Sequence, residues 1–185
     1  MNWKERKPNR LQGYDYSSDN LYFVTSCVQN RVCCFGEIFP DNPVRPHSPK
    51  IILNEYGEIA EKQWHWLAVQ YPYVVLHAFV VMPNHIHGII EINRSHIKSS
   101  DPIKIKSLSE LIGAYKTTVS KQIHLLERTD GSRCTDRSRP VRTFAWQRSF
   151  FEMIIRDRKT YDNISDYIIT NPARWERDKF YNYEQ

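Results

Sequence analysis

The chain has 185 residues and a mass of 22.1 kDa, enough for one domain that buries a core without disulfide or metal support. Its 41% hydrophobic and 25% charged residues exclude wholesale disorder, and no apolar run approaches the ~18 residues of a membrane span. An excess of 26 Lys and Arg over 21 Asp and Glu gives a net charge of +5, which permits a polyanionic partner. The charged N-terminus has no apolar segment after it, so we expect no signal peptide and a cytoplasmic protein.

The first half of the chain is predicted to contain a polar arm, a strand, a helix and a hairpin. The two hairpin strands are rich in β-branched residues, and the short turn Met82-Pro83-Asn84 separates them. The predicted ranges are 1–20 for the arm, 21–28 for the first strand, 51–70 for a segment that is helical over much of its length, and 73–81 and 85–92 for the hairpin strands.

The second half is predicted to contain two helices, one strand and two polar loops. Ser107 and Glu110 have the spacing of a capping box, so they open a helix that continues at helical spacing to Ile123. The remaining ranges are 93–106 and 127–142 for the loops, 143–155 for an aromatic strand that leads into a turn, and 158–171 for the last helix.

The predicted elements follow the order β, α, β, β, α, β, α. This order, with a hairpin in the middle, is typical of an α+β fold with a ferredoxin-like antiparallel sheet. A parallel, doubly wound sheet is less compatible because two strands are joined by only three residues. We expect one domain over residues 1–185.

Two histidines on the second hairpin strand form a candidate metal site. His85 and His87 are two residues apart, so both side chains point to one face of the sheet. Two neighbouring imidazoles can ligate one divalent ion. The alternative is that one histidine belongs to the core and the other to the surface.

The last helix carries a candidate nucleophile and a candidate third ligand. Tyr167 and Asn171 share a helix face with Ile164 and Ile168, so Tyr167 could also be an ordinary core residue. An inward Asn171 needs hydrogen-bond partners, and its carbonyl oxygen suits a hard metal ion. Tyr161 lies six residues before Tyr167 and faces elsewhere, which makes it a poor substitute.

These residues lie in motifs that resemble the single-tyrosine transposases with a His-hydrophobic-His (HUH) motif. Met82-Pro83-Asn84-His85-Ile86-His87-Gly88 looks like that motif. The segment Trp146 to Glu152, followed by Tyr167-Ile168-Ile169-Thr170-Asn171-Pro172, is similar to the C-terminal half of the REP-associated tyrosine transposases. Arg10-Leu11-Gln12-Gly13-Tyr14-Asp15-Tyr16 looks like their opening, so the likeness runs from about residue 10 to about residue 180.

The resemblance implies a transposase that cuts and transfers single-stranded or hairpin DNA with Mg²⁺ or Mn²⁺. It implies that His85 and His87 are metal ligands and that Tyr167 is the catalytic nucleophile, which forms a 5′-phosphotyrosine. Asn171 falls where many insertion-sequence relatives have Gln as the third ligand, which makes it the least secure of the three. The resemblance leaves open a homodimer or a monomer.

The candidate DNA-binding residues are basic, polar or aromatic side chains in the arm, the central helix and the predicted strand over 143–155. Basic side chains can contact phosphates, and arm residues can read or stack on unpaired bases. A solvated charge or a disordered arm is the alternative. The candidates are Arg10, Gln12, Tyr14, Lys116, Lys121 and Arg148.

Three other functions remain open on the sequence alone. A domesticated protein that binds DNA hairpins without cleaving them would have the same charge and aromatic content. A nicking enzyme of the replication-initiator or relaxase kind would share the histidine pair, although such proteins usually carry more flanking sequence. A purely structural metal site is the third alternative, and it predicts that chelation strongly lowers the melting temperature.

Overall fold

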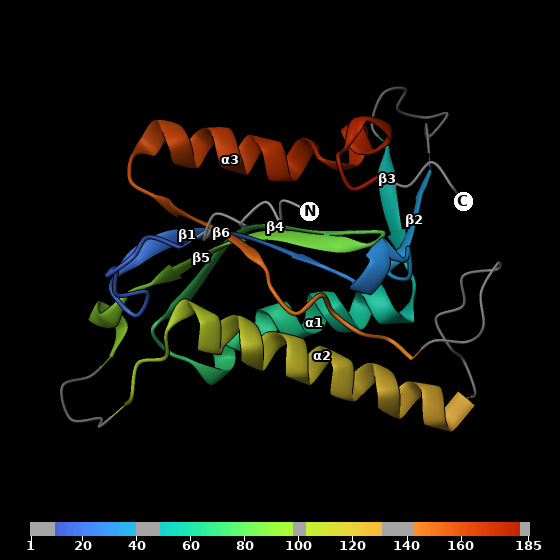
Figure 1. Ribbon diagram of the computed structural model, residues 1–185, viewed down its shortest axis with the longest axis horizontal. Coiled ribbons are helices and arrows are strands. Elements are labelled where there is room, and N and C mark those ends of the chain that lie inside the picture. The colour runs from blue at the N-terminus through green and yellow to red at the C-terminus, as the bar shows by residue number, and fades with distance from the viewer. Residues whose placement is uncertain (1–9, 40–48, 98–102, 131–142, 182–185) are drawn as a thin grey trace, which may run out of the picture.

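A four-stranded antiparallel sheet lies at the centre of the computed structural model, which describes residues 10–39, 49–97, 103–130 and 143–181. Helices α1 and α2 cover one face of this sheet and α3 covers the other (Figure 1). The bounds are β1 Asn20–Cys27, α1 Glu55–Gln70, β4 Val74–Met82, β5 His85–Ile92, α2 Leu108–Asp130, β6 Phe151–Ile155 and α3 Arg158–Thr170. A separate two-stranded sheet contains β2 (Gly36–Phe39) and β3 (Lys50–Leu53).

The strands of the main sheet lie in the order β4-β5-β1-β6, and every neighbouring pair is antiparallel. The chain thus leaves β1 through α1, returns through the β4–β5 hairpin, and reaches the far edge through α2. This is the ferredoxin-like arrangement that the sequence predicted, and it places β5, with its two histidines, in the interior of the sheet.

The face toward α1 and α2 holds the larger hydrophobic core. Trp64 of α1 is fully buried and stacks on Phe79 of β4, with ring centroids 4.5 Å apart. The indole lies directly above Gly88, where a Cβ atom would clash with it. Gly88 is therefore required by the close approach of α1 to β5, immediately after the histidine pair.

The face toward α3 holds a smaller apolar cluster. Ile164 and Ile168 of α3 pack on Phe23 of β1, Ile89 of β5 and Ile155 of β6. These contacts fix α3 across the sheet, and the polar side chains of its last turn lie beside the histidines of β5.

Three predicted boundaries were wrong. Residues 51–53 are not helical but belong to β3, because they pair with β2, and Asn54 then caps α1 by accepting hydrogen bonds from the backbone of Tyr56 and Gly57. Residues 127–130 extend α2 instead of forming a loop, since the buried Glu127 carboxylate accepts hydrogen bonds from Tyr56 and Phe144.

The third wrong boundary is that of the strand expected over residues 143–155. β6 covers only Phe151–Ile155, because residues 143–150 cross the α2 face of the sheet with one isolated bridge between Val28 and Trp146. Parts of the predicted arm and loops, namely 1–9, 98–102 and 131–142, lie outside the described residues. None of the described helices has the length and apolar content needed to cross a membrane.

Candidate functional site

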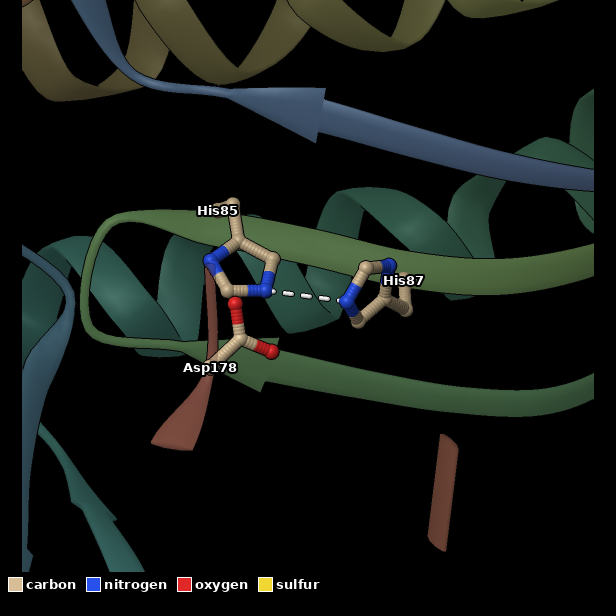
Figure 2. A group of neighbouring side chains, drawn as sticks. All are labelled: His85, His87 and Asp178. Carbon is tan, nitrogen blue, oxygen red and sulfur yellow. Dashed lines mark hydrogen bonds between the residues drawn. The ribbon is translucent and has the colours of Figure 1, made fainter. Parts of the chain in front are cut away.

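The two histidines of β5 converge on one point of the α3 face of the sheet. Their side chains are buried, and Nε2 of His85 lies 3.0 Å from Nε2 of His87 (Figure 2). This separation is close to what two imidazoles have when both bind one ion at about 2.0–2.1 Å. The geometry removes the alternative in which one histidine faces the core and the other the surface.

Asn84 orients the ring of His85. Its amide nitrogen donates to the backbone oxygens of Arg31, at 3.1 Å, and of Phe180, at 2.9 Å. Its oxygen therefore faces Nδ1 of His85 at 2.8 Å, and Nδ1 must be the protonated nitrogen. Nε2 of His85 is left with its lone pair directed into the site, which is the arrangement of a metal-binding histidine with its outer partner.

Thr25 of β1 orients the ring of His87, as Asn84 does for His85. Its hydroxyl lies 2.8 Å from Nδ1 of His87, directly across the β1–β5 ladder. A hydroxyl can accept or donate, so His87 can present a lone pair at Nε2 when an ion is bound and an N–H when none is. Burial and the nearby Lys179 ammonium lower the pKa of His87 to about 3.

Both imidazoles are therefore uncharged at neutral pH. The pKa of His85 is also far below its ordinary value, first because of burial and then because of the charges of His87, Lys179 and Arg31. Neutral imidazole is the form that binds a metal, so no proton has to be removed from the pair near pH 7.

Tyr167 reaches the histidine pair from α3. Its hydroxyl oxygen lies 3.2 Å from Nε2 of His87, and its ring meets the His87 ring at a centroid distance of 5.1 Å. Burial and the Asp178 carboxylate raise the pKa of this hydroxyl above its ordinary value. The phenol is thus protonated at neutral pH and needs help to become a nucleophile.

Asn171, at the end of α3, lies beside Asp178 and has an unsatisfied side-chain oxygen. The side chain is buried, and its nitrogen donates to Oδ2 of Asp178 at 3.2 Å. Its carbonyl oxygen is buried and lacks a hydrogen-bond partner among the described residues. A buried carbonyl without a partner is costly unless a ligand completes it, which fits a metal site.

Asp178 is a further acidic group that the sequence analysis missed. It follows the 3-10 helix η3 (Pro172–Arg177), and its carboxylate accepts the backbone N–H of Phe180 at 2.7 Å. One oxygen of Asp178 and one nitrogen from each of His85 and His87 all lie within 4.8 Å of one another (Figure 2). Two imidazoles with carboxylate and amide oxygens form a donor set that fits a divalent ion such as Mn²⁺.

Two of the predicted DNA-binding residues are engaged by partners within the fold. Arg10 pairs with Glu152 at 2.6 Å, and Lys116 donates to the backbone oxygens of Gln147 and Ser149. Both cations also lie 5.6 Å from the centre of the Phe150 ring.

The other four candidates differ in how far they are exposed. The Tyr14 hydroxyl is half-buried and lies 3.4 Å from that of Tyr22. Gln12, Lys121 and Arg148 are exposed. Burial lowers the pKa of Lys116 to about 8, so this lysine is less suited to a phosphate contact than the exposed ones.

The missed residues carry different sequence signals. Asn84 stands next to the His-x-His pair and was interpreted only as a turn residue. Thr25 is a hydroxyl on the inward face of a hydrophobic strand, a pattern that signals a buried partner. Asp178 has no local signal, since it comes close to His85 and His87 only through the fold.

Comparisons with known proteins found relatives in sequence and in fold. No protein-family model matches the chain. An uncharacterized protein of Haemophilus influenzae is 32% identical over 177 residues, which cover 95% of this chain and 93% of that protein. Another Haemophilus influenzae protein, provisionally named a REP-associated tyrosine transposase, is 25% identical over 160 residues, which cover 86% of this chain and 74% of that protein.

A solved structure supports the fold. The REP-associated tyrosine transposase bound to a REP hairpin matches with a TM-score of 0.52 and 19% identity, over 89% of this chain and 73% of that one. In sequence and in fold, the chain thus resembles the REP-associated tyrosine transposases.

Proposed function

We propose that this chain is a metal-dependent DNA strand transferase that cleaves single-stranded or hairpin DNA through Tyr167. The observation that carries the proposal is the convergence of three groups from distant parts of the chain. The Tyr167 hydroxyl lies 3.2 Å from Nε2 of His87, which lies 3.0 Å from Nε2 of His85. All three groups come from one chain, so a second copy is not needed to complete the site.

The residues that would hold the ion are His85, His87 and Asn171, with Asp178 as an additional oxygen ligand. A bound Mg²⁺ or Mn²⁺ would neutralise charge on the non-bridging oxygens of the scissile phosphate, which phosphodiester cleavage requires. Asn84 and Thr25 keep the two imidazoles turned toward the ion.

Tyr167 supplies the nucleophile in this proposal. Its oxygen bonds to phosphorus while the bond between phosphorus and the 3′ oxygen breaks. The phenol proton leaves to solvent, and the departing 3′ oxygen gains a proton to become a 3′ hydroxyl. The product is a 5′-phosphotyrosine, and because it retains the phosphoester bond, a second 3′ hydroxyl can reverse the step and join another strand.

Hairpin DNA is the substrate with the most direct support. The solved relative with the same fold is bound to a REP hairpin. The net charge of +5 on this chain favours a polyanion in general. We therefore choose a hairpin with single-stranded flanks as the first test substrate.

Covalent capture tests the proposal. The wild-type protein is incubated with Mn²⁺ and a hairpin oligonucleotide labelled on the 3′ side of the cleavage point, and a denaturing gel detects protein joined to DNA. Tyr167→Phe is expected to abolish the adduct, because it removes the attacking oxygen. Tyr161→Phe is the matched control: Tyr161 lies on the same helix but binds His77 at 3.1 Å, so its loss should leave the adduct.

Two results would contradict the proposal. An adduct that persists in Tyr167→Phe would exclude Tyr167 as the nucleophile. Hairpin binding by the wild-type protein that is equal in EDTA and in Mn²⁺, with no adduct over a panel of hairpins, would instead favour the non-cleaving binding protein.

A further inference from the structure

Among the described residues, α3 covers only part of the sheet face that carries the histidines. Helix α3 packs mainly on β4 and β5, while β6 is the edge strand next to β1. On β6, the side chains of Phe151 and Met153 are 42% and 38% exposed. Large apolar side chains that are exposed together at a sheet edge beside a functional site call for an explanation.

Phe151 lies in the same row of the sheet as His87. It pairs with Thr25 across the β6–β1 ladder, and Thr25 pairs with His87 across the β1–β5 ladder. Directly opposite residues in an antiparallel sheet point to the same face, so Phe151 and His87 share the α3 face. Phe151 is therefore two strands away from a proposed metal ligand.

The ring of Phe23 connects Phe151 to the nucleophile. Its centroid lies 6.1 Å from that of Phe151, 5.6 Å from the His87 ring and 6.3 Å from the Tyr167 ring. The side chain of Phe23 is itself buried, and its ring neighbours all three of these rings. Phe151 is thus linked to the Tyr167 ring through one intervening ring.

Positive charge lies next to the exposed ring of Phe151 and to the buried ring of Phe180 beside it. The Lys179 ammonium lies 5.9 Å from the Phe151 ring and 4.8 Å from the Phe180 ring. The Arg31 guanidinium lies 5.2 Å from Phe180 and donates to the backbone oxygen of Lys179. The nearby carboxylate of Asp178 is engaged by Asn171 and by the backbone of Phe180.

We propose that Phe151, Met153 and Lys179, called the β6 surface from here on, bind the unpaired nucleotides next to the scissile phosphate. Bases would stack on Phe151 and Met153, and Lys179 would contact the phosphate between them. Exposed aromatic rings beside cations are the means by which proteins hold single strands without reading their sequence. The inference rests on the proposed function, because it describes how the substrate strand reaches Tyr167.

A second copy of this chain could also pair with the free edge of β6, but the features of the surface favour DNA. A protein partner would not require the ring contacts that link Phe151 through Phe23 to Tyr167. The cations on its border match a phosphate backbone and would repel the same cations of a second copy.

Fluorescence anisotropy in EDTA tests this inference without cleavage. Two hairpins are compared, one blunt and one with a single-stranded flank. The affinity for the flanked hairpin divided by the affinity for the blunt one, called the flank ratio, measures the contribution of the flank. Phe151→Ala is expected to lower this ratio by roughly 5- to 150-fold, the range for the loss of one stacked base. Phe151→Trp should restore it, because the larger ring still stacks.

Phe39→Ala is the matched control, since Phe39 is an exposed aromatic residue on the separate β2–β3 sheet. It should leave the flank ratio unchanged. Thermal melts check that Phe151→Ala folds normally, as expected for an exposed side chain.

Three results would overturn the inference. The first is a flank ratio that Phe151→Ala does not change, or that Phe39→Ala changes equally. The second is a wild-type protein that binds the blunt and the flanked hairpin equally well. That result would overturn this inference but leave the proposed function intact. The third is a dimer of the wild-type protein that Phe151→Ala converts to a monomer without a change in the flank ratio. If the wild-type protein binds neither hairpin, the proposed function fails as well.

Discussion

The two faces of the central sheet differ in what they bury. The face toward α1 and α2 buries mainly aromatic and aliphatic side chains, with Trp64 and Tyr115 among the largest, together with a few polar ones such as Glu127. The face toward α3 buries a small apolar cluster and, next to it, the polar side chains of His85, His87 and Asn171. One sheet thus separates the residues that stabilise the fold from those proposed to do chemistry.

This separation has a physical reason. Buried polar groups cost free energy unless hydrogen bonds or a metal satisfy them. A large apolar core on the opposite face can offset that cost, because hydrophobic stabilisation grows with buried area. Substitutions on the two faces should therefore affect different properties, stability on one and ion binding on the other.

The largest expected effect on stability comes from the α1 face. Trp64→Ala should lower the free energy of unfolding by roughly 3–5 kcal/mol, through lost burial and the cavity left above Gly88. The Trp64 indole N–H has no hydrogen-bond partner among the described residues, so the value should fall toward the lower end. Denaturant unfolding of the variant and of the wild-type protein measures this difference in the free energy of unfolding.

Ile169→Ala serves as the control for Trp64→Ala, because Ile169 is exposed and should change stability by less than about 0.5 kcal/mol. If the folded Trp64→Ala variant bound Mn²⁺ much more weakly than the wild-type protein, the two faces would not have separate effects on stability and ion binding. Isothermal titration calorimetry below the melting temperature of the variant measures this affinity.

On the α3 face, Asp178→Asn should weaken Mn²⁺ binding by about 100-fold, the upper end of what the partners of metal ligands contribute. The amide keeps the shape of the side chain but loses the charge that would face the ion. Titration calorimetry measures the affinity, and melting in EDTA should change little. Asp166→Asn, an exposed carboxylate on α3, should bind Mn²⁺ like the wild-type protein. Equal affinities of Asp178→Asn and the wild-type protein would remove Asp178 from the site.

A smaller effect on ion binding is expected at Asn84, which positions His85 without entering the site. Asn84→Ala should weaken Mn²⁺ binding by about 10-fold, since Nδ1 of His85 loses the acceptor that fixes its tautomer. Nitrogen NMR of the histidine rings should show that the Nδ1–H form of His85 is less populated. Asn163→Ala, at an exposed position of α3, should change neither measurement. An unchanged tautomer in Asn84→Ala would show that other contacts orient the ring.

A further effect is the dependence of stability on pH in EDTA. The pKa of His87 is about 3 in the folded protein and near 6.5 in the unfolded chain, so only the unfolded chain takes up this proton between those values. Stability should therefore fall as the pH drops below about 6.5, with His87 contributing up to about 1.4 kcal/mol per pH unit. His85 acts in the same direction.

Denaturant unfolding between pH 7 and pH 5 measures this slope. His87→Gln should make it shallower, and His65→Gln, at an exposed position of α1, should leave it unchanged. A slope that His87→Gln does not alter would mean that His87 is not held in its neutral form by burial.

Local sequence patterns predicted most of the fold. The alternation in β5 predicted that His85 and His87 share a face, and the 3.6-residue period of α3 predicted that Tyr167 and Asn171 share another. The wrong boundaries arose where distant contacts override local preference. Residues 51–53 become a strand only because β2 is available to pair with them. Glu127 stays helical because Tyr56 and Phe144 bind its carboxylate.

The sequence by itself determined the order of the elements and two pairs of residues, because spacings within one strand or helix are fixed by backbone geometry. Only the tertiary structure decided that Tyr167 meets His87, that Asp178 joins the pair, and that Arg10 and Lys116 are held by internal partners. These outcomes depend on how α3 and the C-terminal segment pack on the sheet. Such packing sums many weak contacts between residues far apart in the chain, and no local pattern encodes it.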